Sequence, residues 1–305
     1  MRIYKNYREK NKVTLYNGNC IDLLRNLPDQ SVNLTVTSPP YCMGKAYEDP
    51  QDDINTFKKL HIDIFDELYR VTKAGGSICW QVGYHVSDKC VVPLDYLIYN
   101  IFIEMSSKFS QPLILRNRII WTFGHGLNST NRFSGRHETI LWFSKGTPSH
   151  FDLDSVRVPQ KYPGKRAYKG NHKGEFSGNP LGKNPSDVWD IPNVKAMHVE
   201  KTIHPCQFPV AIPQRLIKAL TSQNELVLDP FMGSGTTGVA AVIENRRFVG
   251  AEIMPEYYSV AIERITAAAN GTAKVREDKP VFIPNQNSAV ARLPEEFAKV
   301  REGKK

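Results

Sequence analysis

A glycine-rich run between two short apolar segments constrains the fold of this chain more than any other feature. Residues 225–228 predict a buried strand, and residues 229–238 then read Asp-Pro-Phe-Met-Gly-Ser-Gly-Thr-Thr-Gly. Residues 236–246 predict a helix, and a second predicted strand, 247–252, ends in an acid. This succession is typical of nucleotide-binding α/β units, because glycines let the backbone approach a ligand closely. The sequence therefore predicts an α/β fold with a nucleoside-bearing cofactor at this turn.

The residues around the glycines distinguish between two cofactors. A dinucleotide would place its pyrophosphate over the helix N-terminus, where the carboxylate of Asp229 would repel it. A carboxylate suits the positively charged methionine end of S-adenosylmethionine better. We therefore favour S-adenosylmethionine over a nicotinamide dinucleotide. In either case Glu252, at the end of the second strand, is placed to accept hydrogen bonds from ribose hydroxyls.

A second motif follows another predicted buried strand, 31–36, and reads Thr-Ser-Pro-Pro-Tyr from residue 37 to residue 41. To methylate an exocyclic amine, a catalyst must draw the nitrogen lone pair out of conjugation with the ring. Ser38 Oγ and the carbonyl of Pro39 could accept the two amine hydrogens, and Pro40 helps to fix the backbone. Tyr41 offers a flat face for an extruded base. The alternative is a strand that simply ends in a Pro-Pro turn.

Hydrophobic periodicity predicts the remaining regular elements. Most of the chain alternates between helical and strand patterns, which favours an α/β architecture. We expect helices at 53–73, 91–105, 213–222 and 257–268, and strands at 77–82, 118–123 and 138–143.

Positive charge is concentrated in one segment that lacks helical or strand periodicity. The chain has a net charge of +9, and Lys and Arg outnumber Asp and Glu between residues 151 and 183. Clustered cations interleaved with aromatic residues are typical of nucleic-acid contacts, although a solvated loop is the alternative. The cations that we expect on DNA are Lys161, Lys165, Arg166, Lys169 and Lys173.

The loop 124–137 is a second candidate for DNA contacts. Arg132 and Arg136 could hold the phosphate backbone, and Phe133 could fill the gap that a flipped base leaves, or could instead be packed in the protein. Lys45 is a further candidate. We expect no metal, because His125, His137 and His204 are not spaced as metal ligands, and the five cysteines form no CxxC pair. That cysteine usage and the missing signal peptide or spanning segment favour the cytoplasm.

These motifs, in this order, resemble those of the β group of DNA amino-methyltransferases. Ser-Pro-Pro-Tyr is similar to the catalytic tetrapeptide of that family, and residues 229–238 to its cofactor loop. Residues 204–209 (His-Pro-Cys-Gln-Phe-Pro), 16–20 (Tyr-Asn-Gly-Asn-Cys) and 132–145 resemble three further family motifs. Two departures are Asn19, where the family usually has Asp, and Phe208, where many relatives have Lys.

The resemblance implies a site for S-adenosylmethionine that is larger than the glycine turn. By motif position the cofactor residues are Asn19, Cys20, Ser38, His204, Pro205, Gln207, Phe208, Asp229, Pro230, Phe231, Gly233, Ser234, Gly235, Thr236, Thr237 and Glu252. The catalytic residues are Ser38, Pro39, Pro40 and Tyr41.

The resemblance also implies a Rossmann-like methyltransferase fold, with an inserted DNA-recognition region and a seven-stranded, mostly parallel sheet in which residues 13–16 complete the cofactor half. We expect a catalytic half at 1–145, a target-recognition region at 146–195, a cofactor half at 196–268 and a C-terminal arm at 269–305. The implied substrate is adenine N6 or cytosine N4 in double-stranded DNA, since a Ser hydroxyl can hold either amine. Implied partners are a second copy of the chain and a cognate restriction endonuclease in a bacterial or phage setting. A DNA-binding regulator without activity and a nicotinamide oxidoreductase are the alternatives.

Overall fold

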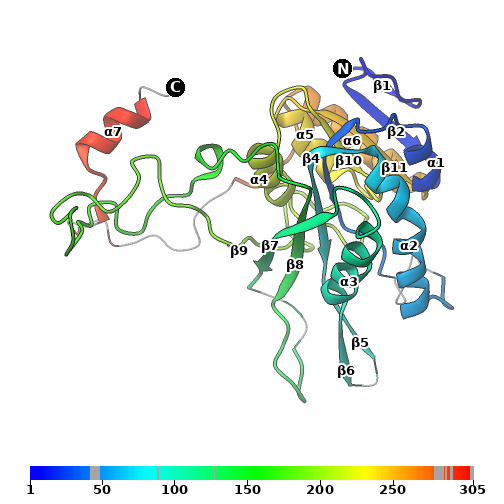
Figure 1. Ribbon diagram of the computed structural model, residues 1–305, viewed down its shortest axis with the longest axis horizontal. Coiled ribbons are helices and arrows are strands. Elements are labelled where there is room, and N and C mark those ends of the chain that lie inside the picture. The colour runs from blue at the N-terminus through cyan, green and yellow to red at the C-terminus, as the bar shows by residue number, and fades with distance from the viewer. Residues whose placement is uncertain are drawn as a thin grey trace. The chain divides into compact units, whose positions relative to one another are not determined.

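A single mixed sheet organises the computed structural model, which describes residues 1–41, 49–87, 89–124, 126, 128–277, 285, 287–288 and 291–302. Within these residues the sheet has nine strands, in the order β1 (Ile3–Tyr4), β2 (Val13–Asn17), β11 (Arg247–Glu252), β10 (Leu226–Asp229), β3 (Val32–Thr37), β4 (Thr72–Val82), β8 (His137–Lys145), β7 (Leu113–Thr122) and β9 (Val188–Asp190). The first six strands of this order, from β1 through β11 and β10 to β4, run parallel to one another. Strand β8 is antiparallel to both its neighbours, β4 and β7. The predicted α/β class is confirmed (Figure 1).

The sheet has two strands more than the expected seven. The additional strands are the edge strands β1 and β9, which have two and three residues. Segments this short cannot display the alternation by which a strand is recognised in a sequence. A hairpin of β5 (Tyr84–Ser87) and β6 (Cys90–Pro93) was also missed. It takes up residues 91–93, which had been predicted as helix, because their pairing with β5 overrides local propensity.

The helices that accompany the sheet form two groups. The first group is α1 (Cys20–Arg25), α2 (Ile54–Val71) and α3 (Leu94–Ser106), in which α2 packs on both others. The second is α4 (Ala211–Leu220), α5 (Thr236–Ile243) and α6 (Pro255–Ala269), in which α5 packs on both others. Helix α2 begins at a capping box, in which Asp53 and Thr56 each accept a backbone hydrogen bond from the other residue. Among the described residues, no helix has the length and apolar character that a membrane crossing requires.

Aromatic side chains fill the core between the sheet and the first helical group. Trp80 on β4 is fully buried, and its Nε1–H donates to His61 Nε2 on α2 at 3.2 Å. His61 Nδ1 lies 2.7 Å from the carbonyl of Phe57, so the imidazole is neutral and donates there. Burial lowers the pKa of His61 to about 4. The ring of Trp80 also meets Phe231 edge-on, at 6.1 Å, so this core packs against the glycine-rich turn at residues 229–238.

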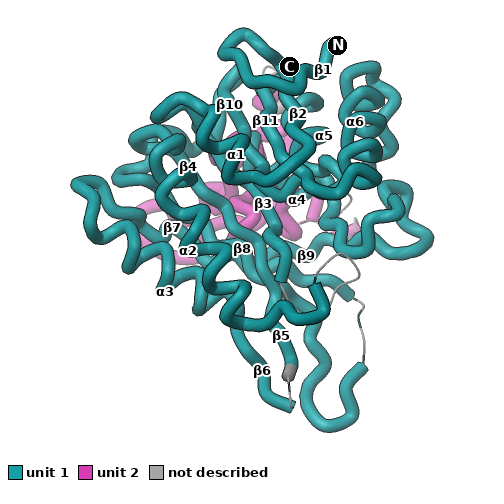
Figure 2. The backbone as a smooth tube through the Cα atoms, turned by 90° about the vertical axis from the view of Figure 1, so that its right-hand side faces the viewer, with its two compact units in different colours: residues 1–151, 187–276 teal, residues 152–186, 277–305 magenta. Residues whose placement is uncertain are grey.

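The chain forms two compact units, which Figure 2 distinguishes by colour. The first comprises residues 1–151 and 187–276 and contains the whole sheet. The second comprises 152–186 and 277–305 and therefore joins most of the basic segment to the end of the chain. It contains the one-turn helix η1 (Asp154–Val156) and α7 (Glu295–Glu302). Phe176 of the basic segment contacts Phe297 on α7 at 5.2 Å, and Arg166 lies over the ring of Phe176.

Candidate active site

The two chemistry-bearing motifs meet because they follow parallel strands that lie side by side. Strand β10 pairs with β3 on one side and with β11 on the other. The residues that end or follow these strands therefore gather at one edge of the sheet, where open α/β sheets bind ligands. A hydrogen bond joins the motifs directly, since Thr37 Oγ1 donates to Asp229 Oδ1 at 2.6 Å.

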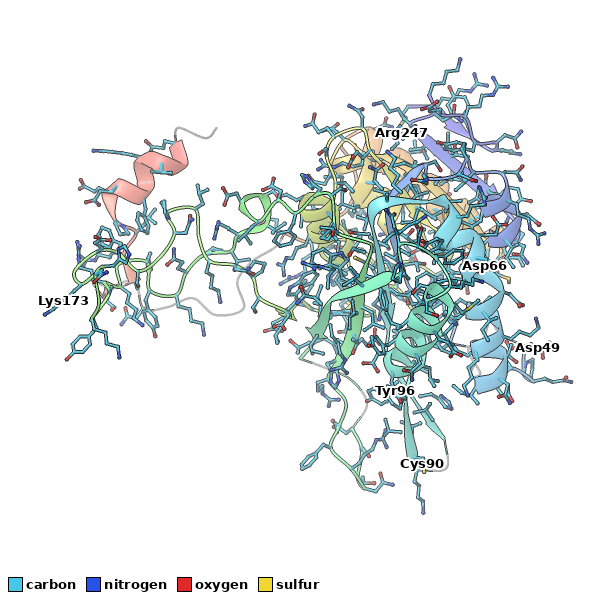
Figure 3. All side chains as sticks on the ribbon, in the orientation of Figure 1. Asp49, Asp66, Cys90, Tyr96, Lys173 and Arg247 are labelled. Carbon is cyan, nitrogen blue, oxygen red and sulfur yellow. The ribbon has the colours of Figure 1, made fainter. Side chains whose placement is uncertain are left out.

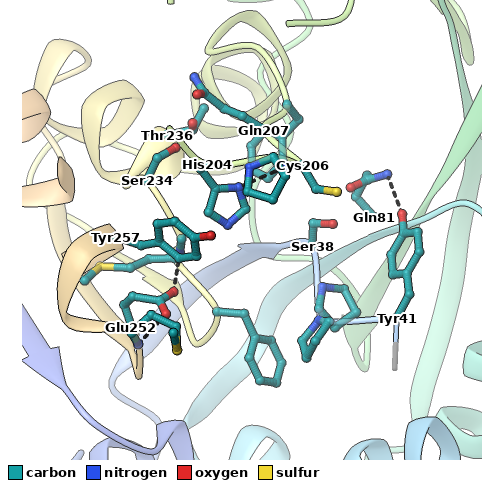
Figure 4. A pocket seen from close by; sticks show the side chains of 18 of the residues that line it. Ser38, Tyr41, Gln81, His204, Cys206, Gln207, Ser234, Thr236, Glu252 and Tyr257 are labelled. Carbon is teal, nitrogen blue, oxygen red and sulfur yellow. Dashed lines mark hydrogen bonds between the residues drawn. The ribbon is translucent and has the colours of Figure 1, made fainter. Parts of the chain in front are cut away.

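A cavity of about 510 Å³ opens at this edge of the sheet. All four predicted catalytic residues line it, and so do most of the predicted cofactor residues (Figure 4). The predicted residues in its wall are Asn19, Cys20, Ser38, Pro39, Pro40, Tyr41, His204, Pro205, Gln207, Phe208, Pro230, Phe231, Gly233, Ser234, Thr236 and Glu252. The wall does not include Asp229, Gly235 or Thr237, which lie behind it.

Asp229 is the clearest difference between the expected and the observed site. Its side chain is 1% exposed, and its carboxylate accepts from Thr37 and from the backbone N–H of Phe231. Thr237 contributes a further side-chain hydrogen bond. Burial raises the pKa of Asp229 to about 7, against the opposing effect of these donors. In this structure Asp229 therefore ties the end of β3 to the glycine-rich turn and does not line the cavity.

Glu252 does face the cavity, and backbone donors fix its carboxylate. Gly233 N–H donates to Oε2 at 2.9 Å and Met254 N–H donates to Oε1 at 2.8 Å. Burial raises the pKa of Glu252. Each carboxylate oxygen can accept more than one hydrogen bond, so Glu252 retains acceptor capacity for a pair of hydroxyl groups.

Tyr41 is held by partners that the sequence did not reveal. The backbone N–H of Gly83 donates to its hydroxyl oxygen at 2.8 Å, and Gln81 Nε2 donates to it at 3.4 Å. Gln81 also donates to Glu138, and both side chains line the cavity. Burial, and then the nearby charge of Glu138, hold the pKa of Tyr41 well above its usual range. These contacts fix the ring next to Ser38.

His204 is neutral and forms another part of the wall. Its Nδ1 accepts from the N–H of Cys206 at 3.2 Å, and its ring meets Tyr257 at 4.5 Å in an edge-on arrangement. Burial lowers the pKa of His204 to about 4, with a smaller contribution from the charge of Lys201. Gly233 has φ of +50°, and a Cβ there would lie 3.0 Å from His204 Nε2, so only glycine fits this turn without strain. Tyr257 was not predicted, since it lies on a helix outside the motifs.

The predicted DNA-contact residues that the structure describes do not line this cavity. Phe133 is fully exposed, so the packed alternative is wrong. With Arg132 and Arg136 it lines a second hollow of about 720 Å³, to which the β5–β6 hairpin also contributes. The predicted cations of the basic segment are all exposed, and Lys173 projects from the second unit (Figure 3). Lys45 and His125 lie outside the described residues. Within the described ranges, no group of three or more His, Cys, Asp or Glu could hold a metal ion.

Known proteins resemble this chain in sequence and in fold. A family model described as DNA methylase, of the N6/N4 type, matches residues 32–263. The Type II methyltransferase M.BglII of Bacillus subtilis is 46% identical over 250 residues, which cover 82% of this chain and 68% of that protein.

Two solved structures show the same fold. The cytosine-N4-specific PvuII DNA methyltransferase matches with a TM-score of 0.63 at 22% identity, over 85% of this chain and 91% of that one. A DNA modification methylase from Thermus thermophilus, complexed with S-adenosyl-L-methionine, matches with a TM-score of 0.58 at 24% identity, over 84% of this chain and 96% of that one.

Proposed function

The chain belongs to the N6/N4 family of DNA methylases, and we propose that it methylates the exocyclic amine of an adenine or cytosine flipped out of double-stranded DNA. One observation carries the proposal. The Ser-Pro-Pro-Tyr motif and the glycine turn come from distant parts of the sequence, and both line one cavity. The hydrogen bond that joins them connects Thr37 to Asp229, which are 192 residues apart. A methyl donor and an acceptor amine could therefore meet there.

The cofactor of this family is S-adenosylmethionine, and the cavity residues fit it. The volume of the cavity, about 510 Å³, is in the range of small-molecule sites, about 300–1,000 Å³. Glu252 would accept hydrogen bonds from the ribose hydroxyls, and Phe231 and Asn19 would flank the adenine. His204, Ser234 and Thr236 would surround the methionine end. Bound S-adenosylmethionine supplies an electrophilic methyl group.

The residues of the tetrapeptide would hold and activate the amine. Ser38 Oγ and the Pro39 carbonyl would accept its two hydrogens, which favours a tetrahedral nitrogen with an available lone pair. Tyr41 would stack on the base, with its ring fixed by the N–H of Gly83. The methylated nitrogen then loses a proton to solvent. Neutral His204 is placed to shape the wall, since its pKa of about 4 makes it a weak base.

Substitution of Glu252 tests the cofactor assignment. We expect Glu252→Gln to raise the Kd for S-adenosylmethionine by about 10- to 100-fold, because an amide N–H would face the donors that now meet a carboxylate. Isothermal titration calorimetry measures this change. Glu256→Gln, at an exposed position four residues along the chain, is the matched control. An unchanged Kd for Glu252→Gln would remove Glu252 from the cofactor site.

DNA would be held by the exposed cations of the basic segment and by the loop that carries Phe133. The cations would neutralise phosphates, and Phe133 would enter the space that the flipped base leaves. A restriction endonuclease with the same recognition sequence would be the partner enzyme, as the similarity to a Type II methyltransferase suggests. We also propose a homodimer, which sedimentation of the purified protein would detect.

Removal of the exposed ring tests the flipping step. We expect Phe133→Ala to raise the KM for duplex DNA by about tenfold, because the variant loses the stacking of one aromatic ring on the bases beside the gap. DNA with a mismatch at the target base should restore the KM, since an unpaired base costs less to extrude. Tyr96→Ala, at another exposed aromatic residue, is the control. An equal loss on matched and mismatched DNA would argue against a role in flipping.

Transfer of labelled methyl groups tests the proposed function as a whole. The purified protein is incubated with S-adenosylmethionine labelled in its methyl group and with duplex DNA or RNA of the same sequence. We expect label in DNA only. Label in RNA would change the substrate class, and bound cofactor without transfer to either polymer would favour a DNA-binding protein without activity.

A further inference from the structure

The wall of the cavity holds no cation among its described residues. Its charged side chains are the carboxylates of Asp49, Asp52, Glu138 and Glu252. Phe208, which is apolar, occupies the motif position where a lysine would have been expected. S-adenosylmethionine, the proposed ligand on which this inference rests, carries a carboxylate at its methionine end. The carboxylates in the wall would repel the carboxylate of the ligand, and no cationic side chain in the described wall offsets this repulsion.

A guanidinium lies directly behind one part of the wall. Arg264 projects from α6, and its Nη1 donates to the carbonyl of Ser234 at 2.8 Å, to Ser234 Oγ at 2.9 Å and to Thr236 Oγ1 at 2.9 Å. Among the described residues, no carboxylate lies within ion-pair distance of Arg264, and Glu200 attracts it only from farther away. Burial lowers the pKa of Arg264 to about 10, so the group remains charged at neutral pH.

The two hydroxyl groups connect this charge to the cavity. Ser234 and Thr236 are each 3% exposed, line the cavity, and lie next to each other in its wall (Figure 4). Each hydroxyl oxygen accepts from Arg264, so its own proton points elsewhere. In the described part of the chain neither hydroxyl donates a hydrogen bond, so both protons remain available to an acceptor in the cavity. Donation from a cation polarises such hydroxyls and strengthens the bonds that they donate.

We infer that Arg264 selects the carboxylate of the bound cofactor from behind the cavity wall, acting through the hydroxyls of Ser234 and Thr236. The arrangement provides two donors and a compensating positive charge without placing a cation in the cavity, where the sulfonium of the cofactor would be repelled. The first turn of α5, which begins at Thr236, adds partial positive charge on the same side. Arg264 is thus a positioning residue with an electrostatic role, and not only a structural support for the glycine turn.

A comparison of two ligands separates these roles. Decarboxylated S-adenosylmethionine retains the nucleoside, the sulfonium and the ammonium but lacks the carboxylate. We expect the wild-type protein to bind S-adenosylmethionine about 10- to 100-fold more tightly than the decarboxylated ligand, as for one charge-assisted interaction. In Arg264→Met this ratio should fall to about one, mainly through weaker binding of S-adenosylmethionine, and Arg264→Lys should keep part of the ratio. Calorimetry gives both constants for each protein.

The ratio of the affinities for the two ligands is also measured in control variants. Arg247→Met removes a positive charge at the start of β11 (Figure 3) and should leave the ratio unchanged. If Arg264→Met does not fold, the double variant Ser234→Ala/Thr236→Val removes both donors with Arg264 in place, and should lower the ratio as well. Equal weakening of both ligands, or a wild-type ratio near one, would overturn the inference and leave the proposed function intact. Failure of the wild-type protein to bind S-adenosylmethionine would overturn both.

Discussion

We expect Ser38→Ala to lower kcat for methyl transfer to DNA by about 100- to 1,000-fold, the usual effect of losing one group that stabilises a transition state. Ser38 Oγ lies in the cavity wall and is proposed to accept a hydrogen from the amine as its nitrogen becomes tetrahedral. This interaction strengthens only in the transition state, so kcat should fall by a larger factor than any rise in the KM for S-adenosylmethionine, which Ser38 is also expected to contact. Steady-state rates with a labelled methyl donor give both constants.

The control for this substitution is the serine at the opposite end of β3, just outside the strand. Ser31 precedes the first residue of β3, at the end of the strand away from the cavity, and its hydroxyl donates to the carbonyl of Pro28. Ser31→Ala should leave kcat unchanged. If Ser38→Ala also retained the wild-type kcat, Ser38 would not hold the amine and another group in the cavity would have to do so.

Replacement of Asp229 should change how the stability of the protein depends on pH. Its folded-state pKa of about 7 lies above the ordinary value of 3.8, so folding favours the protonated form. The stabilisation from this group is therefore fully present below pH 3.8 and is lost as the pH rises through 7. The asparagine in Asp229→Asn cannot ionise, so this variant should not lose that stabilisation as the pH rises. We expect the variant to gain up to about 4 kcal/mol relative to the wild-type protein between about pH 4 and about pH 8.

Urea unfolding at several pH values measures this difference. Asp187→Asn, which removes a carboxylate at an exposed position, is the control for a general effect of the lost charge. Parallel stability curves for Asp229→Asn and the wild-type protein would mean that the carboxylate is ionised at no cost, and that its surroundings compensate its burial.

The elements that carry the two motifs were predictable because their signals are local. The apolar strands β3, β10 and β11, the glycines at 233 and 235 and the proline pair at 39 and 40 each act through neighbouring residues. Parallel order then places the ends of these strands at one edge of the sheet. The cavity contains most of the predicted residues for this reason.

The unpredicted parts of the site depend on contacts between residues far apart in the sequence. Gln81 and Glu138 meet Tyr41 through strand pairing, and Arg264 reaches Ser234, in the turn before α5, from helix α6. No periodic pattern marks such contacts. The orientation of Asp229 was not predictable from the sequence either. Its motif position indicated the edge of the cavity, but its hydrogen bonds turn its carboxylate toward Thr37.

Nucleoside mass spectrometry tests the central claim most directly. Unmethylated duplex DNA of mixed sequence is incubated with the wild-type protein and S-adenosylmethionine, digested to nucleosides and analysed beside a sample treated with Ser38→Ala. Methylation at the exocyclic amine predicts N6-methyladenine or N4-methylcytosine in the wild-type sample and little of either in the other. Unmodified DNA in the presence of bound cofactor, or a methyl group on a ring carbon, would contradict the assignment of the Ser-Pro-Pro-Tyr motif as the amine-holding site.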